Sequence, residues 1–317
     1  MTFIKSLFAK SEFIVFLGLL VVGAFFSFQS PVFLSSFNLQ NIILQSSIMG
    51  IIAIGMTFVI LTAGIDLSVG SVVALSGILM ATMLNSGMNV ALVLLINLVF
   101  GIAIGIFHGF SITKMRMAPF IVTLATMAMA RGLTMVVSDG RTLFAFPESF
   151  NYFGAGKVAS IPVAIIIFLL YAITAEILLQ KTVLGRNIYA VGSNIKAAAL
   201  SGIRTNRILT FVYVVSGVSC AIAGTILSGR LDAAMPTAAT GAELDAIAAV
   251  IIGGASLFGG KGTIIGTVIG VLLIGVINNG MNLMNVPPFW QSFIKGAVIF
   301  LAVLIDSIKN SSEEAAI

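Results

Sequence analysis

The chain has 317 residues, of which 59% are hydrophobic and only 9% are charged. Soluble domains carry roughly a quarter charged residues, so this composition excludes an ordinary soluble protein and indicates a membrane protein. The net charge of +5 comes from cations in short segments between apolar runs, which argues against a nucleic-acid-binding domain. His108 and Cys220, the only residues of their kinds, exclude a His/Cys metal cluster and an intrachain disulfide.

The first apolar run follows Lys5 and Lys10, an order that signal peptides share. No cleavage site of small residues follows the run, so we expect an uncleaved first span whose N-terminus lies inside. About 20 apolar residues cross a bilayer as a helix, and about ten such segments fit into the chain. In chain order they lie at about 13–28, 40–62, 68–84, 89–112, 119–137, 161–178, 208–229, 242–257, 263–283 and 289–305.

Lys and Arg are distributed unevenly over the segments between these spans. Short loops rich in Lys and Arg are retained in the cytoplasm. With both termini inside, most cations fall in the inner segments, and the outer segments hold only Arg141, Lys157 and Arg230. The sequence therefore predicts an all-α membrane protein, a polytopic bundle of about ten transmembrane helices with both termini in the cytoplasm.

Five spans on each side of the midpoint suggest two inverted five-helix halves. Residues 64–67, which open the third span, resemble residues 241–244, which open the eighth. The glycines that recur every fourth residue in spans four and nine are in different registers, which weakens the repeat. We expect these glycines to allow close helix packing.

Two loops stand out by length and charge. The segment 180–207 carries Lys181, Arg186, Lys196, Arg204 and Arg207 without a carboxylate, which predicts a cytoplasmic docking surface. The segment 138–160 is the longest outer loop and is rich in aromatic residues.

Polar groups inside the spans are candidates for a transport pathway. Asp66 interrupts an apolar stretch, where it either caps the third span or takes part in the pathway. Arg131 lies deep in the fifth span, where we expect an interhelical hydrogen bond or ion pair. Neutral polar groups suit a polyhydroxy substrate or, equally, hydrogen bonds between helices. The candidate pathway residues are Gln45, Ser47, Asp66, Ser68, Asn278 and Asn279.

No Ser/His/Asp set, pair of catalytic carboxylates or metal-ligand cluster is discernible, so we expect neither an enzyme nor a metal site. The segment 254–263 looks like a phosphate-binding loop, but Ala255 and Gly262 stand where that loop needs Gly and Ser or Thr. We interpret the segment as a tight cytoplasmic turn with Lys261 as an anchor. Any ATP-driven motor must therefore come from another subunit.

Four blocks in this order resemble the ribose-type sugar permeases of bacterial ATP-binding-cassette importers. They are GMTFVILTAGIDLSVGS (55–71), LGRNIYAVGSNIKAAALSGI (184–203), PTAATGAELDAIAAVIIGGASLFGGKGTIIGT (236–267) and NNGMNLM (278–284). The resemblance covers about residues 35 to 306. It implies that residues 1–317 form a single transmembrane permease domain in the bacterial cytoplasmic (inner) membrane. Such a permease moves a monosaccharide, with ribose as the first choice, into the cell by alternating access.

The resemblance also implies three partners: a second copy of the chain in a homodimer, a cytoplasmic ATPase that binds ATP and magnesium, and a periplasmic or other extracytoplasmic sugar-binding protein. No cofactor is expected in the chain itself. The segment that resembles the coupling loop contains Gly185, Arg186, Gly192, Asn194, Lys196, Ala197, Ala198 and Gly202.

One position departs from the family pattern. Relatives commonly carry an acidic residue where this chain has Lys196, which leaves the specific ATPase open. A bulky residue in place of Gly202 is expected to uncouple transport from ATP hydrolysis. On the other side, Arg141, Lys157 and Arg230 are candidates for pairing with carboxylates of the binding protein.

Other interpretations stay open. An ion-coupled secondary sugar transporter could act alone, with Asp66 and either Glu243 or Asp245 as a proton relay. A passive channel or membrane scaffold is a further alternative. Permeases that resemble this chain also serve allose, xylose, galactose-type hexoses and autoinducer-2.

Overall fold

The computed structural model describes residues 11–314, so Lys5 and Lys10 lie outside the described residues. Eight helices of the described part are long and apolar enough to cross a membrane. They are α2 (Ser11–Gln29), α3 (Ser36–Leu61), α5 (Val90–Thr113), α6 (Pro119–Ser138), α8 (Val163–Lys181), α11 (Thr205–Leu231), α13 (Ile264–Leu283) and α14 (Pro288–Glu314). The prediction of an all-α polytopic membrane protein is confirmed.

Two of the predicted spans form shorter helices. α4 (Val69–Asn85) has 17 residues, and α12 (Ala242–Ile252) has 11. At 1.5 Å per residue α12 is about 16 Å long, roughly half the hydrocarbon thickness of a bilayer. The predicted span at 242–257 is therefore wrong, because Gly254 adopts φ of +95° and ends the helix. Both short helices correspond to the third span of their half, and the inverted relation of the halves stays a prediction.

Short elements connect the long helices. α9 (Val183–Ser193) and α10 (Ile195–Leu200) fill much of the segment 180–207, and α7 (Glu148–Ala155) lies in the expected outer loop. β1 (Leu143–Phe144) pairs antiparallel with β4 (Ala233–Ala234), with Leu143 opposite Ala234. β2 (Lys157–Val158) pairs antiparallel with β3 (Ile161–Pro162), with Lys157 opposite Pro162. Both loops therefore contain short helices or strands of their own.

α3 and α11 form the centre of the bundle. Every residue of α3 from Gly50 to Leu61 is buried, and α11 packs against both α3 and α5. A Cβ atom at Gly105 of α5 would overlap the backbone of Val214 in α11. The glycines of the fourth span therefore allow close helix packing, as expected.

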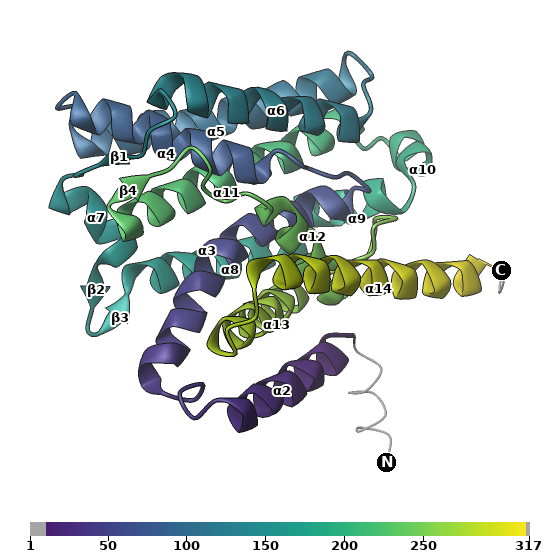
Figure 1. The fold of residues 1–317 in the computed structure, drawn as a ribbon. Coiled ribbons are helices and arrows are strands. Elements are labelled where there is room, and N and C mark those ends of the chain that lie inside the picture. The colour runs from purple at the N-terminus through teal and green to yellow at the C-terminus, as the bar shows by residue number, and fades with distance from the viewer. Residues whose placement is uncertain (1–10, 315–317) are drawn as a thin grey trace.

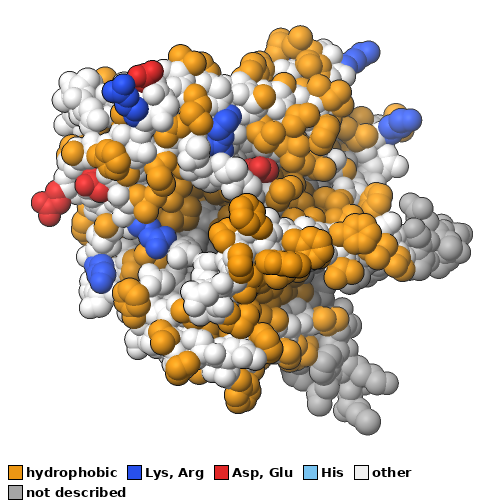
Figure 2. Space-filling model, in the orientation of Figure 1, with side chains coloured by type: hydrophobic (Ala, Val, Ile, Leu, Met, Phe, Trp, Pro, Cys, Tyr) orange, Lys and Arg blue, Asp and Glu red, His pale blue; other side chains and the backbone are white. Residues whose placement is uncertain are grey.

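Figure 1 shows the connecting elements at two opposite ends of the bundle. α10 lies at one end, where α2 begins and α14 ends, and α7 lies at the other with the small sheets. We call these the α10 end and the α7 end. In Figure 2, hydrophobic side chains cover much of the surface between them, and most charged side chains lie toward the two ends. Such an apolar belt is the surface that a bilayer covers.

Candidate functional site

α10 has six residues, too few to be stable as an isolated helix. Its first turn is capped by Asn194. The side-chain oxygen of Asn194 accepts hydrogen bonds from the backbone N–H groups of Lys196 and Ala197, both at 3.0 Å. The side chain of Asn194 therefore fixes where α10 begins.

The other end of α10 is fixed by Gly202, which adopts φ of +84°. The N–H group of Gly202 donates to the carbonyl of Ala199, and that of Ile203 donates to the carbonyl of Ala198. These two bonds around a left-handed glycine make a Schellman motif. α10 is thus a short helix that is held at both ends.

α10 exposes an apolar side chain outside the helices that cross the membrane. Leu200 is 91% exposed, and Ile195 is 46% exposed, whereas Ala198 is buried against the bundle. Lys196 and Ala197 are also exposed. An exposed apolar residue beside a cation is typical of a surface that another protein covers.

α9 joins α10 to the bundle through two glycines. A Cβ atom at Gly185 would overlap the carbonyl of Leu179 in α8, and one at Gly192 would overlap the carbonyl of Leu61 in α3. The Leu61 carbonyl also accepts a hydrogen bond from the N–H group of Gly260, at 2.9 Å. The end of α3 at Leu61, the end of α9 at Gly192 and the segment 253–263 at Gly260 are therefore in mutual contact.

Tyr189 strengthens this junction. Its hydroxyl donates a hydrogen bond to the carbonyl of Gly262, at 2.7 Å. Burial raises the pKa of Tyr189 to about 12, so the phenol keeps its proton at neutral pH. Arg186, in contrast, is exposed on α9.

Asp66 lies just beyond α3 and is only 2% exposed. One carboxylate oxygen accepts hydrogen bonds from the Ser68 N–H group at 3.0 Å and from the Ser68 hydroxyl at 2.6 Å. The other accepts from the Ser216 hydroxyl of α11 at 2.7 Å and lies 3.9 Å from Nδ1 of His108. This geometry favours the role of holding the start of α4 over a place in the pathway.

A cavity of about 220 Å³ lies between α3, α4, α11 and the start of α12. Its lining includes Gln45 of α3, Val73 of α4, Arg230 of α11, and Ala239 and Ala242. The amide of Gln45 and the guanidinium of Arg230 supply the hydrogen-bonding groups that a polyhydroxy compound needs. Of the candidate pathway residues, Gln45 alone lines this cavity.

The other neutral pathway candidates lie apart from the cavity. Asn279 of α13 and Asn38 of α3 exchange two hydrogen bonds between their amides, at 2.8 and 2.9 Å. Ser47 is fully buried and donates to the carbonyl of Leu44 in its own helix. The side-chain oxygen of Asn278 is buried and accepts no hydrogen bond within the described chain. Asn279 therefore joins two helices, as the alternative interpretation of these residues expects.

Arg131 also has a structural partner. Its guanidinium donates to the backbone carbonyls of Pro236 and Ala238, at 2.5 and 3.1 Å. These bonds satisfy two backbone carbonyls of the irregular segment before α12. In the first turn of α12, Asp245 pairs with Lys295 of α14 at 2.8 Å.

α7 is held tightly at its own end of the bundle. Phe150 is fully buried, and Gly154 lies so close to α11 that a Cβ atom would overlap the backbone N of Arg230. Asp232 accepts hydrogen bonds from the Phe146 N–H group and the Asn151 amide, at 2.9 and 2.8 Å. These bonds lower the pKa of the Asp232 carboxyl below its ordinary value.

The three cations proposed to meet a binding protein are in different surroundings. Arg141 and Lys157 are exposed, and Arg141 lies 3.3 Å from the exposed Asp139. Arg230 is half-buried and lines the cavity. Only Arg141 and Lys157 are therefore available on the open surface.

Leu200, Tyr189 and the place of Arg230 were not singled out from the sequence. The caps of α10 were readable, because Asn194 and Gly202 bracket seven residues that contain no helix breaker. The position of Arg230 at a cavity depends on packing between distant segments, for which the sequence carries no local signal.

Comparison with known proteins agrees with this architecture. The ribose import permease protein RbsC of Bacillus subtilis is 47% identical over 298 residues, which are 93% of this chain and 92% of that protein. RbsC of Escherichia coli K12 is 45% identical over 298 residues, 93% of each chain. The D-allose transport system permease protein AlsC of the same organism is 41% identical over 294 residues, 92% of this chain and 90% of that protein. No solved structure matches the chain. The family described as the permease component of branched-chain amino acid transport systems matches residues 38–303, and the chain therefore belongs to this permease family.

Proposed function

We propose that this chain is the membrane-spanning subunit of an ATP-binding-cassette importer that moves ribose into the cell by alternating access. The observation that carries the proposal is α10, a helix fixed at both ends that exposes Leu200 outside the helices long enough to cross a membrane. A subunit without a motor of its own needs such a surface for the ATPase that drives it. We choose ribose as the substrate because the relatives at 45–47% identity are named ribose import permeases, whereas the D-allose permease is 41% identical.

In this proposal the α10 end faces the cytoplasm, with both termini, and the α7 end faces outward. The basic segment 180–207 then lies on the side where Lys and Arg are retained. The membrane is the bacterial inner membrane, and a second copy of the chain completes a homodimer. ATP and magnesium bind to the ATPase subunit and not to this chain.

Movement of the ATPase would reach the membrane through α9. Gly192 and Tyr189 join α9 to the end of α3 and to the segment 253–263, so a shift of α10 acts on both. Lys196 is exposed on the docking helix and favours a carboxylate on the ATPase.

The cavity between Gln45 and Arg230 is the proposed part of the sugar pathway. Both side chains hydrogen-bond hydroxyl groups without requiring a charged substrate. At the α7 end, Arg141 and Lys157 are exposed and suit carboxylates on a sugar-binding protein.

Reconstitution tests the proposal. The chain is placed in vesicles with its ATPase and its binding protein, and uptake of labelled ribose is measured with and without ATP. Uptake is expected only with all components and ATP. Uptake by the chain alone on a proton or sodium gradient would instead establish the secondary transporter.

A matched pair of variants tests the pathway. Arg230→Gln removes a charged donor from the cavity and is expected to slow ribose uptake about tenfold, since hydrogen bonds to charged groups contribute about 1.5–3 kcal/mol. Arg141→Gln makes the same change on the open surface and is expected to alter only the salt dependence of uptake. Equal effects of the two variants would contradict a place for Arg230 in the pathway.

A further inference from the structure

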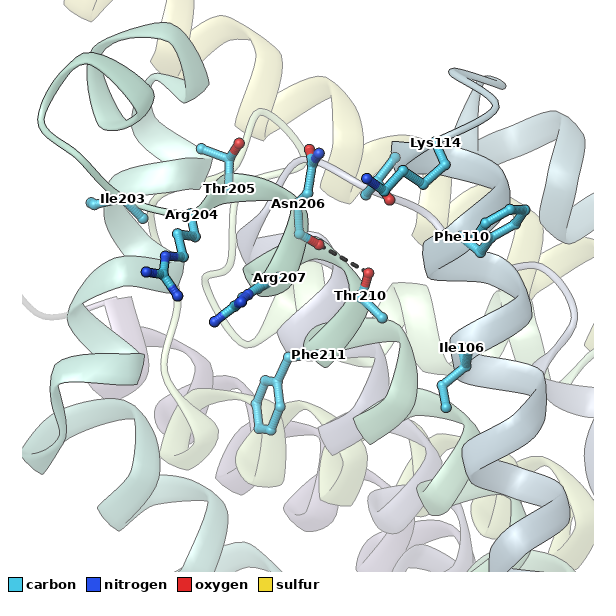
Figure 3. Close-up of a pocket in the computed structure, with 11 residues that line it drawn as sticks. Ile106, Phe110, Lys114, Ile203, Arg204, Thr205, Asn206, Arg207, Thr210 and Phe211 are labelled. Atoms are coloured by element: carbon cyan, nitrogen blue, oxygen red, sulfur yellow. Dashed lines mark hydrogen bonds between the residues drawn. The ribbon is translucent and has the colours of Figure 1, made fainter.

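A larger cavity, of about 750 Å³, lies at the α10 end between the last turns of α5 and the first turns of α11. Its lining contains Lys114, Arg204 and Arg207 and no acidic residue. Figure 3 shows Arg204 and Arg207 on one side of the start of α11 and Lys114 at the end of α5 on the other. Three cations therefore surround one open groove.

The three cations are free to meet an anion. Lys114, Arg204 and Arg207 are exposed, and none of them is in an ion pair within the described part of the chain. The hydroxyl of Thr210 lies between α5 and α11 and is turned to its own helix, where it donates to the carbonyl of Asn206. The groove thus has a surplus of positive charge that no described side chain neutralises in an ion pair.

The floor of the groove is apolar and lies within the membrane-crossing helices. Ile106 and Phe110 of α5 are 51% and 55% exposed, and Phe211 of α11 completes the lining. Ile106 precedes Lys114 by eight residues, which along the helix is about 12 Å. A ligand that fills the groove must therefore join an anionic group to a long apolar part.

We propose that this groove binds an anionic phospholipid, whose phosphate lies on Lys114, Arg204 and Arg207 and whose acyl chain lies on Ile106, Phe110 and Phe211. A soluble anion would leave the apolar floor uncovered, and a soluble protein would have to enter the bilayer to reach it. The lipid belongs to the cytoplasmic leaflet, a detail that rests on the proposed orientation. The site itself does not depend on which substrate is transported.

The test uses the full-length chain in nanodiscs of phosphatidylcholine, titrated with fluorescent phosphatidylglycerol. Each cation near a membrane surface contributes about fivefold to the affinity for an anionic lipid. The triple variant Lys114→Gln, Arg204→Gln, Arg207→Gln is therefore expected to bind about 100-fold more weakly. A matched triple variant, Lys181→Gln, Arg186→Gln, Lys196→Gln, removes the same charge from exposed positions that do not line the groove and is expected to keep most of the affinity.

Several outcomes would overturn the proposal. Unchanged binding by the first triple variant, or an equal loss in the second, would show a diffuse charge effect without a site. Displacement of the lipid by soluble glycerol 3-phosphate would show a phosphate site instead. Loss of ATPase association by the first variant in pure phosphatidylcholine would show that the groove receives protein.

The floor has its own test. Phe110→Ser is expected to weaken binding of long-chain phosphatidylglycerol and to leave binding of the dihexanoyl form unchanged, because only the long chain reaches the floor. An equal loss for both lipids would overturn the assignment of the acyl chain. A thermal unfolding scan of each variant without phosphatidylglycerol verifies that the chain is folded.

Discussion

α7 and α10 are both short helices that do not cross the membrane. α7 buries its large apolar side chain, whereas α10 exposes one. α7 buries Phe150 completely and is held by Gly154 and Asp232. α10 leaves Leu200 91% exposed, although both of its ends are capped. Two short helices are thus fixed in place by different kinds of contact. The packing of α7 completes the fold, whereas the caps of α10 prepare a surface for a partner.

The largest expected effect concerns stability at the α7 end. Phe150→Ala removes a fully buried ring and is expected to lower the free energy of unfolding by about 3–5 kcal/mol. Leu200→Ala is the control and is expected to change it by less than about 0.5 kcal/mol. Denaturant unfolding of the detergent-purified chain measures both. Similar losses would mean that Leu200 packs within the chain.

The next effect concerns binding at the α10 end. Leu200→Asp places a charge on the exposed apolar position and is expected to weaken ATPase binding by about 2 kcal/mol, or about 30-fold. Phe144→Asp changes an aromatic residue that is 61% exposed at the α7 end and is expected to leave ATPase binding unchanged. Titration of the ATPase onto the reconstituted variants gives both constants. Loss of binding in the Phe144 variant would remove the distinction between the ends.

Gly202 and Gly87 allow the effect of a substitution on coupling to be distinguished from its effect on backbone strain. Gly202 and Gly87 have φ of +84° and +83°, and a Cβ atom at either position meets open space. Valine at each position is expected to cost about 1–2 kcal/mol of stability, because both conformations are left-handed. Only Gly202→Val is expected to lower the amount of ribose transported per ATP hydrolysed. Gly87 lies at the α7 end, away from the proposed ATPase contact. The ratio of sugar transported to ATP hydrolysed measures this, and a normal ratio in the Gly202 variant would contradict it.

The smallest expected effect is a dependence on pH at the α7 end. Hydrogen bonds from Asn151 and Phe146 lower the pKa of the Asp232 carboxyl from its ordinary value of 3.8. The ionised carboxylate therefore stabilises the fold above about pH 3.8, and this stabilisation is lost as the pH falls through the lower folded pKa. Protection of the Phe146 amide, measured as its exchange rate relative to the intrinsic rate at the same pH, is expected to fall in acid, and less so in Asp232→Asn, which keeps an acceptor and tolerates the left-handed backbone. Equal acid responses would rule out Asp232 as the cause.

The long helices were predictable because their apolar runs match the bilayer. The span expected at about 89–112 is α5 at Val90–Thr113. The error at 242–257 arose because Gly253 and Gly254 are apolar by composition, although their backbone ends α12. A hydropathy criterion does not distinguish an apolar residue that continues a helix from a glycine that terminates it.

The candidate site was predictable from the sequence only where contacts between neighbouring residues determine the structure. Asn194 and Gly202 cap α10 through residues three or fewer positions away, and such signals are visible in one sequence. Arg131 donates to Pro236 and Ala238, about a hundred residues further along the chain, and Arg230 meets Gln45 only in the folded bundle. Contacts of that range follow from packing and have no counterpart in the spacing of residues.

The paired amides of Asn38 and Asn279 have a consequence for motion. Each side chain is both donor and acceptor to the other, so a small separation of α3 and α13 loses both bonds at once. The two hydrogen bonds are therefore expected to break and form together. The start of α3 and the end of α13 are therefore expected to move together for as long as both hydrogen bonds are intact.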